Sequence, residues 1–143
     1  MRRALEIRRR VFVDEQGVPL AEEIDEHDLA DPEAVHALAL EGDRALGTGR
    51  FYPLDRERVQ IGRMAVLAEV RGAGIGGRLL AALAAEAARR GYRTGCLLAQ
   101  LAAIPLYERA GFRPAGGAEA RVWDGGILHQ PMEGPLTPAP GAV

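Results

Sequence analysis

Three common residue types are absent from this 143-residue sequence: it has no lysine, no asparagine and no serine, so all 18 basic residues are arginines. Without serine the chain cannot use a serine nucleophile, and without lysine it cannot form a Walker-type phosphate loop. The single cysteine, Cys96, excludes an intramolecular disulfide and lies in an apolar run, where a packing role is expected. The three histidines lack the spacing of metal ligands, so we expect no metal.

Long apolar segments and clusters of basic and aromatic residues are also missing. No run approaches the length that spans a bilayer, and the few aromatic residues, 5% of the chain, are not grouped with the arginines. We therefore expect neither a membrane nor a nucleic acid as a partner. The arginine-rich start is not followed by the apolar segment of a signal peptide, and one cysteine suits a reducing compartment, so a cytoplasmic location is expected.

Length and composition predict one globular domain. With 143 residues, of which 48% are apolar and 27% charged, the chain can bury a core of ordinary size. Proline, glycine and alanine are frequent after Met132, with little side chain to bury. We expect residues 1–133 to form the domain and residues 134–143 to form a flexible tail.

The net charge of −2 hides an uneven distribution. Residues 14–33 contain nine acids and no arginine, whereas the rest of the chain carries 18 arginines against 11 acids. Such asymmetry can steer ligands, and the basic part suits an anionic cofactor while the acidic part suits a cationic amine. The alternative is that the acidic segment is a solvated loop with no role. On the first interpretation, neutralising Glu22, Glu23 and Asp25 raises the KM for the acceptor.

Hydrophobic periodicity predicts an α/β domain with a mixed sheet and helices on both faces. Helices are expected at residues 5–15, 78–90 and 104–110, and strands at residues 34–40, 45–52, 58–67, 94–99, 113–118 and 128–133. The turn at residues 41–43 makes the first two strands a hairpin.

A glycine-rich turn between the strand at 58–67 and the helix at 78–90 is the most informative feature. Such a turn presents unpaired N–H groups beside the positive end of a helix dipole, which is a site for phosphate or pyrophosphate. Gly72, Gly74 and Gly77 also satisfy the dinucleotide pattern G-x-G-x-x-G. However, four residues separate strand from turn, and residues 90–98 lack the acid that a dinucleotide site requires.

Two motifs in this region resemble the GNAT superfamily of N-acetyltransferases. The first is R-x-x-G-x-G at Arg71, Gly74 and Gly76, which resembles the acetyl-CoA pyrophosphate loop of that family. The second, about thirty residues later, consists of Ala99-Gln100, Ala103, Tyr107 and Gly111-Phe112. The opening R-x-V-F-V-x-E-Q at residues 9–16 is similar to a bacterial subgroup of the family, and the match extends from about residue 8 to residue 132.

The resemblance implies a GNAT fold that binds acetyl-CoA as co-substrate. A GNAT fold normally begins with a strand, for which the residues before Arg8 leave no room. We therefore expect either that the first edge strand is missing or that the true start of the protein lies upstream of Met1. The implied cofactor-binding residues are Met64, Ala65, Val66, Arg71, Gly72, Ala73, Gly74, Ile75, Gly76, Gly77 and Gln100. Tyr107 is the implied general acid for the departing thiolate, because a phenol is protonated at neutral pH.

The implied activity is direct transfer of an acetyl group from acetyl-CoA to a small, cationic amine. The resemblance also implies a homodimer. The alternative is a module that binds acetyl-CoA as a sensor without turnover. Residues that resemble the acceptor site are Glu15, Gln16, Glu23, Asp25, His36 and His129. The general base remains open among Glu22, Glu23, Asp25, His27, Asp28, His36 and His129, acting directly or through water.

Overall fold

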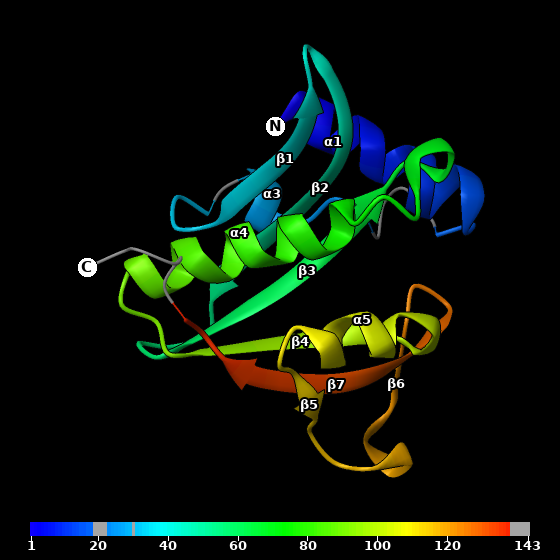
Figure 1. The fold of residues 1–143 in the computed structure, drawn as a ribbon. Helices are drawn as coiled ribbons and strands as arrows, with labels where there is room; N and C mark the ends of the chain where they lie inside the picture. Colours follow the sequence, from blue (N-terminus) through cyan, green and yellow to red (C-terminus); the bar gives the residue numbers. More distant parts are fainter. Residues whose placement is uncertain (19–22, 30, 138–143) are drawn as a thin grey trace.

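A mixed β-sheet forms the centre of the computed structural model, which describes residues 1–18, 23–29 and 31–137 (Figure 1). The strands within these residues are β1 (Val35–Glu41), β2 (Arg44–Pro53), β3 (Arg58–Val66), β4 (Thr94–Gln100), β5 (Arg113–Pro114), β6 (Val122–Asp124) and β7 (Ile127–Pro135). Their order is β1-β2-β3-β4-β7-β5, and β6 also pairs with β7. Only β3 and β4 are parallel; all other pairs are antiparallel.

The helices differ from the expected ones mainly at their boundaries. They are α1 (Arg2–Arg8), the π-helix η1 (Arg9–Glu15), α3 (Glu26–Leu29), α4 (Ile75–Arg89) and α5 (Ile104–Arg109), with short 3₁₀ turns at Ala68–Val70, Leu101–Ala103 and Ala118–Ala120. The helix expected at residues 5–15 is therefore two consecutive segments with different winding. The helix expected from residue 78 begins at Ile75, so the last three residues of the predicted glycine turn form its first turn.

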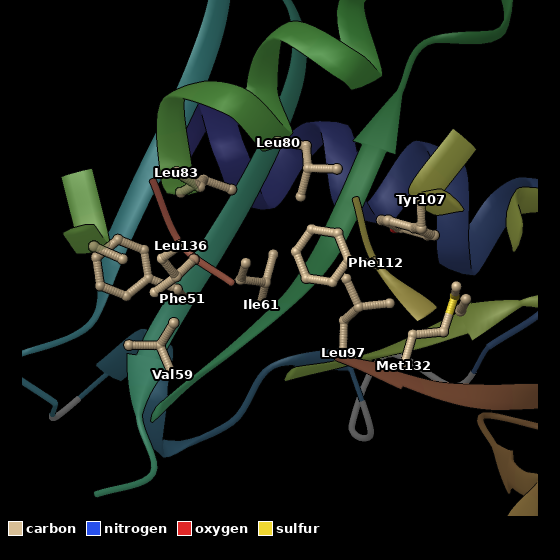
Figure 2. Packing of buried hydrophobic residues seen from close by; sticks show 12 residues of the cluster. Phe51, Val59, Ile61, Leu80, Leu83, Leu97, Tyr107, Phe112, Met132 and Leu136 are labelled. Atoms are coloured by element: carbon tan, nitrogen blue, oxygen red, sulfur yellow. The ribbon is translucent and has the colours of Figure 1, made fainter. Parts of the chain in front are cut away.

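Two separate apolar clusters hold helices on opposite faces of the sheet. Figure 2 shows Leu80 and Leu83 of α4 packed with Phe51 and Ile61, in a cluster that extends to Tyr107 of α5. On the other face α1 and η1 pack through a smaller cluster, composed of Ile7, Val11, Ala65 and Leu67. Burying such side chains contributes about 1.5–3 kcal/mol each, so both helix layers are fixed to the sheet.

A β-bulge in β3 changes the direction of its side chains. Thr48 pairs with Ala65 but Arg50 pairs with Gly62, so β3 has one residue more than β2 in this interval. Arg63 takes up the extra residue with φ of +51°, a left-handed conformation that is rare for a side chain of this size. As a result, Ile61 faces the α4 cluster whereas Ala65 faces α1.

The predicted and observed structures differ most in the C-terminal part of the chain. The strand expected at 113–118 is limited to Arg113–Pro114, and β6 was not expected. Strand β7 continues past residue 133 to Pro135, and Leu136 is 8% exposed within the main cluster, so the expected tail cannot start at residue 134. Residues 138–143 lie outside the described part of the chain.

Candidate active site

The sheet opens where β3 and β4 separate. Their parallel pairing extends from Arg58 opposite Thr94 to Ile61 opposite Leu97, and beyond this point each strand continues without the other. A cavity of about 310 Å³ occupies the gap, lined by residues 60–66 of β3 on one side and by Leu98 and Gln100 of β4 on the other. The unpaired edge of β3 therefore presents backbone N–H and C=O groups to a ligand that lies along it.

The glycine-rich turn lies at the end of β3 and supplies free donors. Among the described residues, the N–H groups of residues 72–77 donate to no protein acceptor, since the first helical bond of α4 runs from Arg78 N–H to Gly74 O. Gly72 and Gly74 have φ of +89° and +78°, which other residues adopt only at a cost. These donors precede a 15-residue helix whose dipole adds positive potential, so the turn is suited to a pyrophosphate.

The side chain of Arg71 is engaged within the protein. Its two terminal nitrogens donate to the Glu15 carboxylate at 2.6 and 2.8 Å, and its Nε donates to the Val66 carbonyl at 3.0 Å. The hydrogen bond from Arg71 holds the pKa of Glu15 below its usual value. Arg71 therefore shapes the turn, and the free N–H groups are the donors available to a phosphate.

Tyr107 lies across the cavity from β3, on α5. Its ring packs edge-on against Phe112, with ring centres 6.3 Å apart, and the residue is 7% exposed while still lining the cavity. Within the described part of the chain its hydroxyl has no hydrogen-bond partner, and the hydroxyl is not completely buried. Burial raises the pKa of Tyr107 to about 12, so the phenol remains a donor over the whole physiological range.

Gln100 and His129 line the same cavity from adjacent strands, directly opposite each other in the β4–β7 register. Gln100 exchanges two side-chain hydrogen bonds with Gln16, at 3.0 and 3.3 Å. The Nδ1 atom of His129 lies 2.7 Å from the Ile127 carbonyl, which can only accept, so Nδ1 carries the proton. In the neutral ring the lone pair is then on Nε2.

In the described part of the acidic segment some acids are paired inside the protein, while others, such as Asp14 and Glu26, are exposed. Three arginines, Arg8, Arg50 and Arg63, are paired with three of its acids, Glu23, Asp25 and Asp28, at distances of 2.6–3.5 Å. The interpretation that Glu23 and Asp25 attract a cationic amine stays a prediction, although arginine side chains already pair with both carboxylates. Glu22 lies outside the described residues.

The pKa values in this cluster move in two directions. Burial acts to raise the pKa of both aspartates, but hydrogen bonds from Arg50 to Asp25 and from Arg8 to Asp28 outweigh it and hold both pKa values below the usual range. For Glu23 burial dominates over its bond from Arg8, and the pKa is raised. Glu23 is thus the acid of this cluster that accepts a proton most easily.

The structure brings together some of the predicted residues and separates others. Of the seven candidate bases only Glu23 and His129 line the cavity among the described residues. His36 lies on β1 with Nε2 3.4 Å from the His27 carbonyl, and His27 stacks on Tyr52 and pairs with Asp31. Lining residues that were not predicted as site residues are Val11, Phe12, Val18, Arg50, Tyr52, Gln60, Ile61, Gly62, Arg63, Leu98, Ala103, Asp124, Gly125 and Ile127.

Comparison with known proteins decides the family to which this site belongs. The sequence model of the acetyltransferase (GNAT) family matches residues 1–112. The chain belongs to the GNAT family. This acetyltransferase is 37% identical over 129 residues to the uncharacterized N-acetyltransferase YjcF of Bacillus subtilis (strain 168), a match that covers 90% of this chain and 88% of that protein. The narrower assignment to a subgroup by residues 9–16 stays a prediction.

Solved structures agree with the GNAT fold. Escherichia coli ElaA is 27% identical with a TM-score of 0.78, over 92% of this chain and 87% of that one. A GNAT family acetyltransferase from Elizabethkingia anophelis with acetyl-CoA bound is 23% identical with a TM-score of 0.58, over 73% and 76% of the two chains, and at this identity shows the fold alone. No helix of the described residues is long and apolar enough to cross a membrane, and no group of three or more His, Cys, Asp or Glu side chains among them is arranged to hold a metal ion.

Proposed function

We propose that this GNAT protein transfers an acetyl group directly from acetyl-CoA to the amine of a small molecule. The observation that carries the proposal is the cavity between β3 and β4. Tyr107 lines it from α5, and so does Arg71, which directly precedes the residues with free N–H groups. Transfer from a thioester that carries a pyrophosphate requires three features: an anion site for the pyrophosphate, an unpaired strand edge for the arm, and a hydrogen-bond donor for the departing thiolate.

The residues present fit acetyl-CoA laid from the glycine-rich turn, which adjoins the cavity at Arg71, along β3. The N–H groups of residues 72–77 would hold the pyrophosphate, and the free edge of Met64, Ala65 and Val66 would pair with the amide groups of the pantetheine arm. When bound, acetyl-CoA supplies a thioester whose carbonyl is open to attack by an amine. A backbone N–H near Val66 would polarise that carbonyl, and Gln100 would contact the arm.

The acceptor must lose a proton before it can attack. An aliphatic amine has a pKa near ~10 and is about a thousandth neutral at pH 7, so a base or a water held by a base is required. His129 is the better placed of the two cavity-lining candidates. Among the described residues its Nε2 has no partner, whereas the Oε1 atom and the backbone carbonyl of Glu23 already form hydrogen bonds or ion pairs with Arg8 and Arg63. We assign His129 the role of proton acceptor.

Replacing His129 with glutamine is expected to lower kcat about a hundredfold, the lower end of the range for a lost general base, with acetyl-CoA affinity unchanged. Glu23→Gln is the comparison variant, and it should lower the melting temperature because Arg8 loses a charged partner, while kcat of the folded protein changes little. Steady-state kinetics at a temperature where both variants are folded provide the measurement. The reverse pattern would assign the base to Glu23.

The cofactor is tested by thermal unfolding with and without ligand. A ligand that binds only the native state raises the midpoint, and at about 100 times Kd it adds ~2.7 kcal/mol to the free energy of unfolding. Acetyl-CoA should raise the midpoint by several degrees and NAD should not. Release of the CoA thiol with a panel of primary amines then tests turnover. A cooperative transition that acetyl-CoA leaves unmoved would contradict the assignment of the glycine turn.

A further inference from the structure

Two consecutive residues at the end of η1 contact the two opposite walls of the cavity. Glu15 binds the guanidinium of Arg71, which also holds the Val66 carbonyl at the end of β3. Gln16 binds Gln100 at the end of β4. Since β3 and β4 are no longer paired here, these contacts are side-chain connections between the separated strands.

The Glu15–Arg71 pair uses every nitrogen of the guanidinium. Two parallel N–H···O bonds to one carboxylate fix the orientation of both side chains, and the third bond fixes Arg71 to the strand that precedes the turn. Arg71 directly precedes residues 72–77, whose N–H groups donate to no acceptor among the described residues. The position of these donors relative to β3 therefore depends on a carboxylate from a different layer of the fold.

We propose that Glu15 is a positioning residue of the cofactor loop. It holds the pyrophosphate donors in place through Arg71 and links them to η1, whose Val11 and Phe12 also line the cavity. The inference rests on the proposed function, because its ligand is acetyl-CoA. Glu15 touches neither the pyrophosphate donors nor the reacting atoms; its effect passes through Arg71.

A purely structural role is a poor explanation for this pair. The side chains of Glu15 and Arg71 are 41% and 42% exposed, and ion pairs at such positions add little to the free energy of unfolding. Ordering a loop before the ligand arrives instead lowers the entropic cost of binding. The pair should therefore affect ligand affinity more than it affects the melting temperature without ligand.

The test is a double-mutant cycle on the affinity for acetyl-CoA, measured by isothermal titration calorimetry. The variants are Glu15→Ala, Arg71→Ala and the double variant, with Glu15→Gln as a milder change and Glu86→Ala as control. Glu86 also pairs with arginines, Arg89 and Arg90, but near the far end of α4. We expect Glu15→Ala to weaken binding about fivefold to tenfold, and to have almost no effect once Arg71 is removed.

Each outcome has one meaning. Equal or tighter binding by Glu15→Ala overturns the inference, because Arg71 would then be better placed when released. A full effect of Glu15→Ala in the Arg71→Ala background also overturns it, since Glu15 would act by another route. If the unmodified chain itself does not bind acetyl-CoA, the proposed function fails instead.

Discussion

Replacing Tyr107 with phenylalanine is expected to lower kcat for acetyl transfer about a hundredfold while leaving the affinity for acetyl-CoA within about twofold. The ring, which packs against Phe112, stays in the core, so only the hydroxyl inside the cavity is lost. A thiol has a pKa near ~8.5, well below that of the buried phenol. Tyr107 therefore acts chiefly by donating a hydrogen bond to the developing thiolate. The proton of the attacking nitrogen would pass to the base or to solvent, and the released thiolate would take its proton from solvent.

The matched control is Tyr92→Phe. Tyr92 also packs edge-on against a phenylalanine, Phe51, with ring centres 6.5 Å apart, but it is not among the residues that line the cavity. The kcat of the Tyr92→Phe variant should equal that of the parent. Equal kcat values for parent and Tyr107→Phe under conditions where chemistry limits the rate would remove Tyr107 from the mechanism.

The pH dependence of the parent tests the same residue. Because burial raises the pKa of Tyr107 to about 12, its phenol stays protonated, and the rate should not fall through its ionisation between about pH 8 and about pH 10. The rate should rise over that interval as more of the acceptor amine is neutral. A decline with an apparent pKa near ~10 would show that the essential phenol is not the buried one.

The local structure of the glycine-rich turn, the proposed cofactor site, was predictable because its information is local. A glycine-rich turn before an amphipathic helix determines both the free N–H groups and the dipole, and the structure changes only the residue at which the helix begins, Ile75. The separation of β3 from β4, in contrast, was not predictable from the sequence. It depends on where parallel pairing ends, at Ile61 and Leu97, and nothing in either strand sequence marks that point.

The ion-pair cluster formed by the arginines and acids around Asp28 was not predicted, although the sequence contained one indication of it. On α1 and η1 the buried residues Ala4, Ile7, Arg8 and Val11 follow the helical repeat, so Arg8 occupies a position of the apolar stripe. An arginine there requires a buried partner. The partners lie 15 and 20 residues further along the chain, and their identity follows from tertiary structure alone.

Leu136 is buried although a flexible tail was expected from residue 134, and this difference also arises from tertiary contacts. Composition after residue 133 suggested little to bury, but one leucine next to a strand end is enough to extend order when a core cluster has room for it. Leu136 N–H donates to the Arg93 carbonyl at 2.8 Å, and its side chain joins Phe112 in the main cluster. A count of residue types over ten positions cannot detect a single contact of this kind.

Asp28→Asn is expected to destabilise the protein by about 3 kcal/mol or more, a loss of roughly 10 °C in melting temperature. The Asp28 side chain is 0% exposed and accepts bonds from Arg8 at 2.6 and 2.9 Å, from Arg50 at 2.9 Å and from the Asp25 N–H at 3.1 Å. Asparagine removes the charge that compensates two buried guanidinium groups. Asp14→Asn, at an exposed position of η1, is the control and should melt like the parent.

The pH dependence separates a lost charge from a general packing defect. The folded pKa of Asp28 lies below its unfolded value of ~3.9, so its contribution to stability is complete above about pH 4 and disappears as the pH falls through the folded pKa. The difference in melting temperature between parent and Asp28→Asn should therefore shrink on acidification below about pH 4. A difference that is constant with pH would mean that shape, not charge, explains the defect.

The same variant also bears on the acceptor site. Arg50 and Arg63 line the cavity, and Arg50 is held in place by Asp25 and Asp28. If the acids of this segment serve to fix these arginines, Asp28→Asn should alter the KM for the amine only in proportion to the loss of folded protein at the assay temperature. A large rise in KM while the variant remains fully folded would instead show that the acid cluster acts on the amine itself, as its charge first suggested.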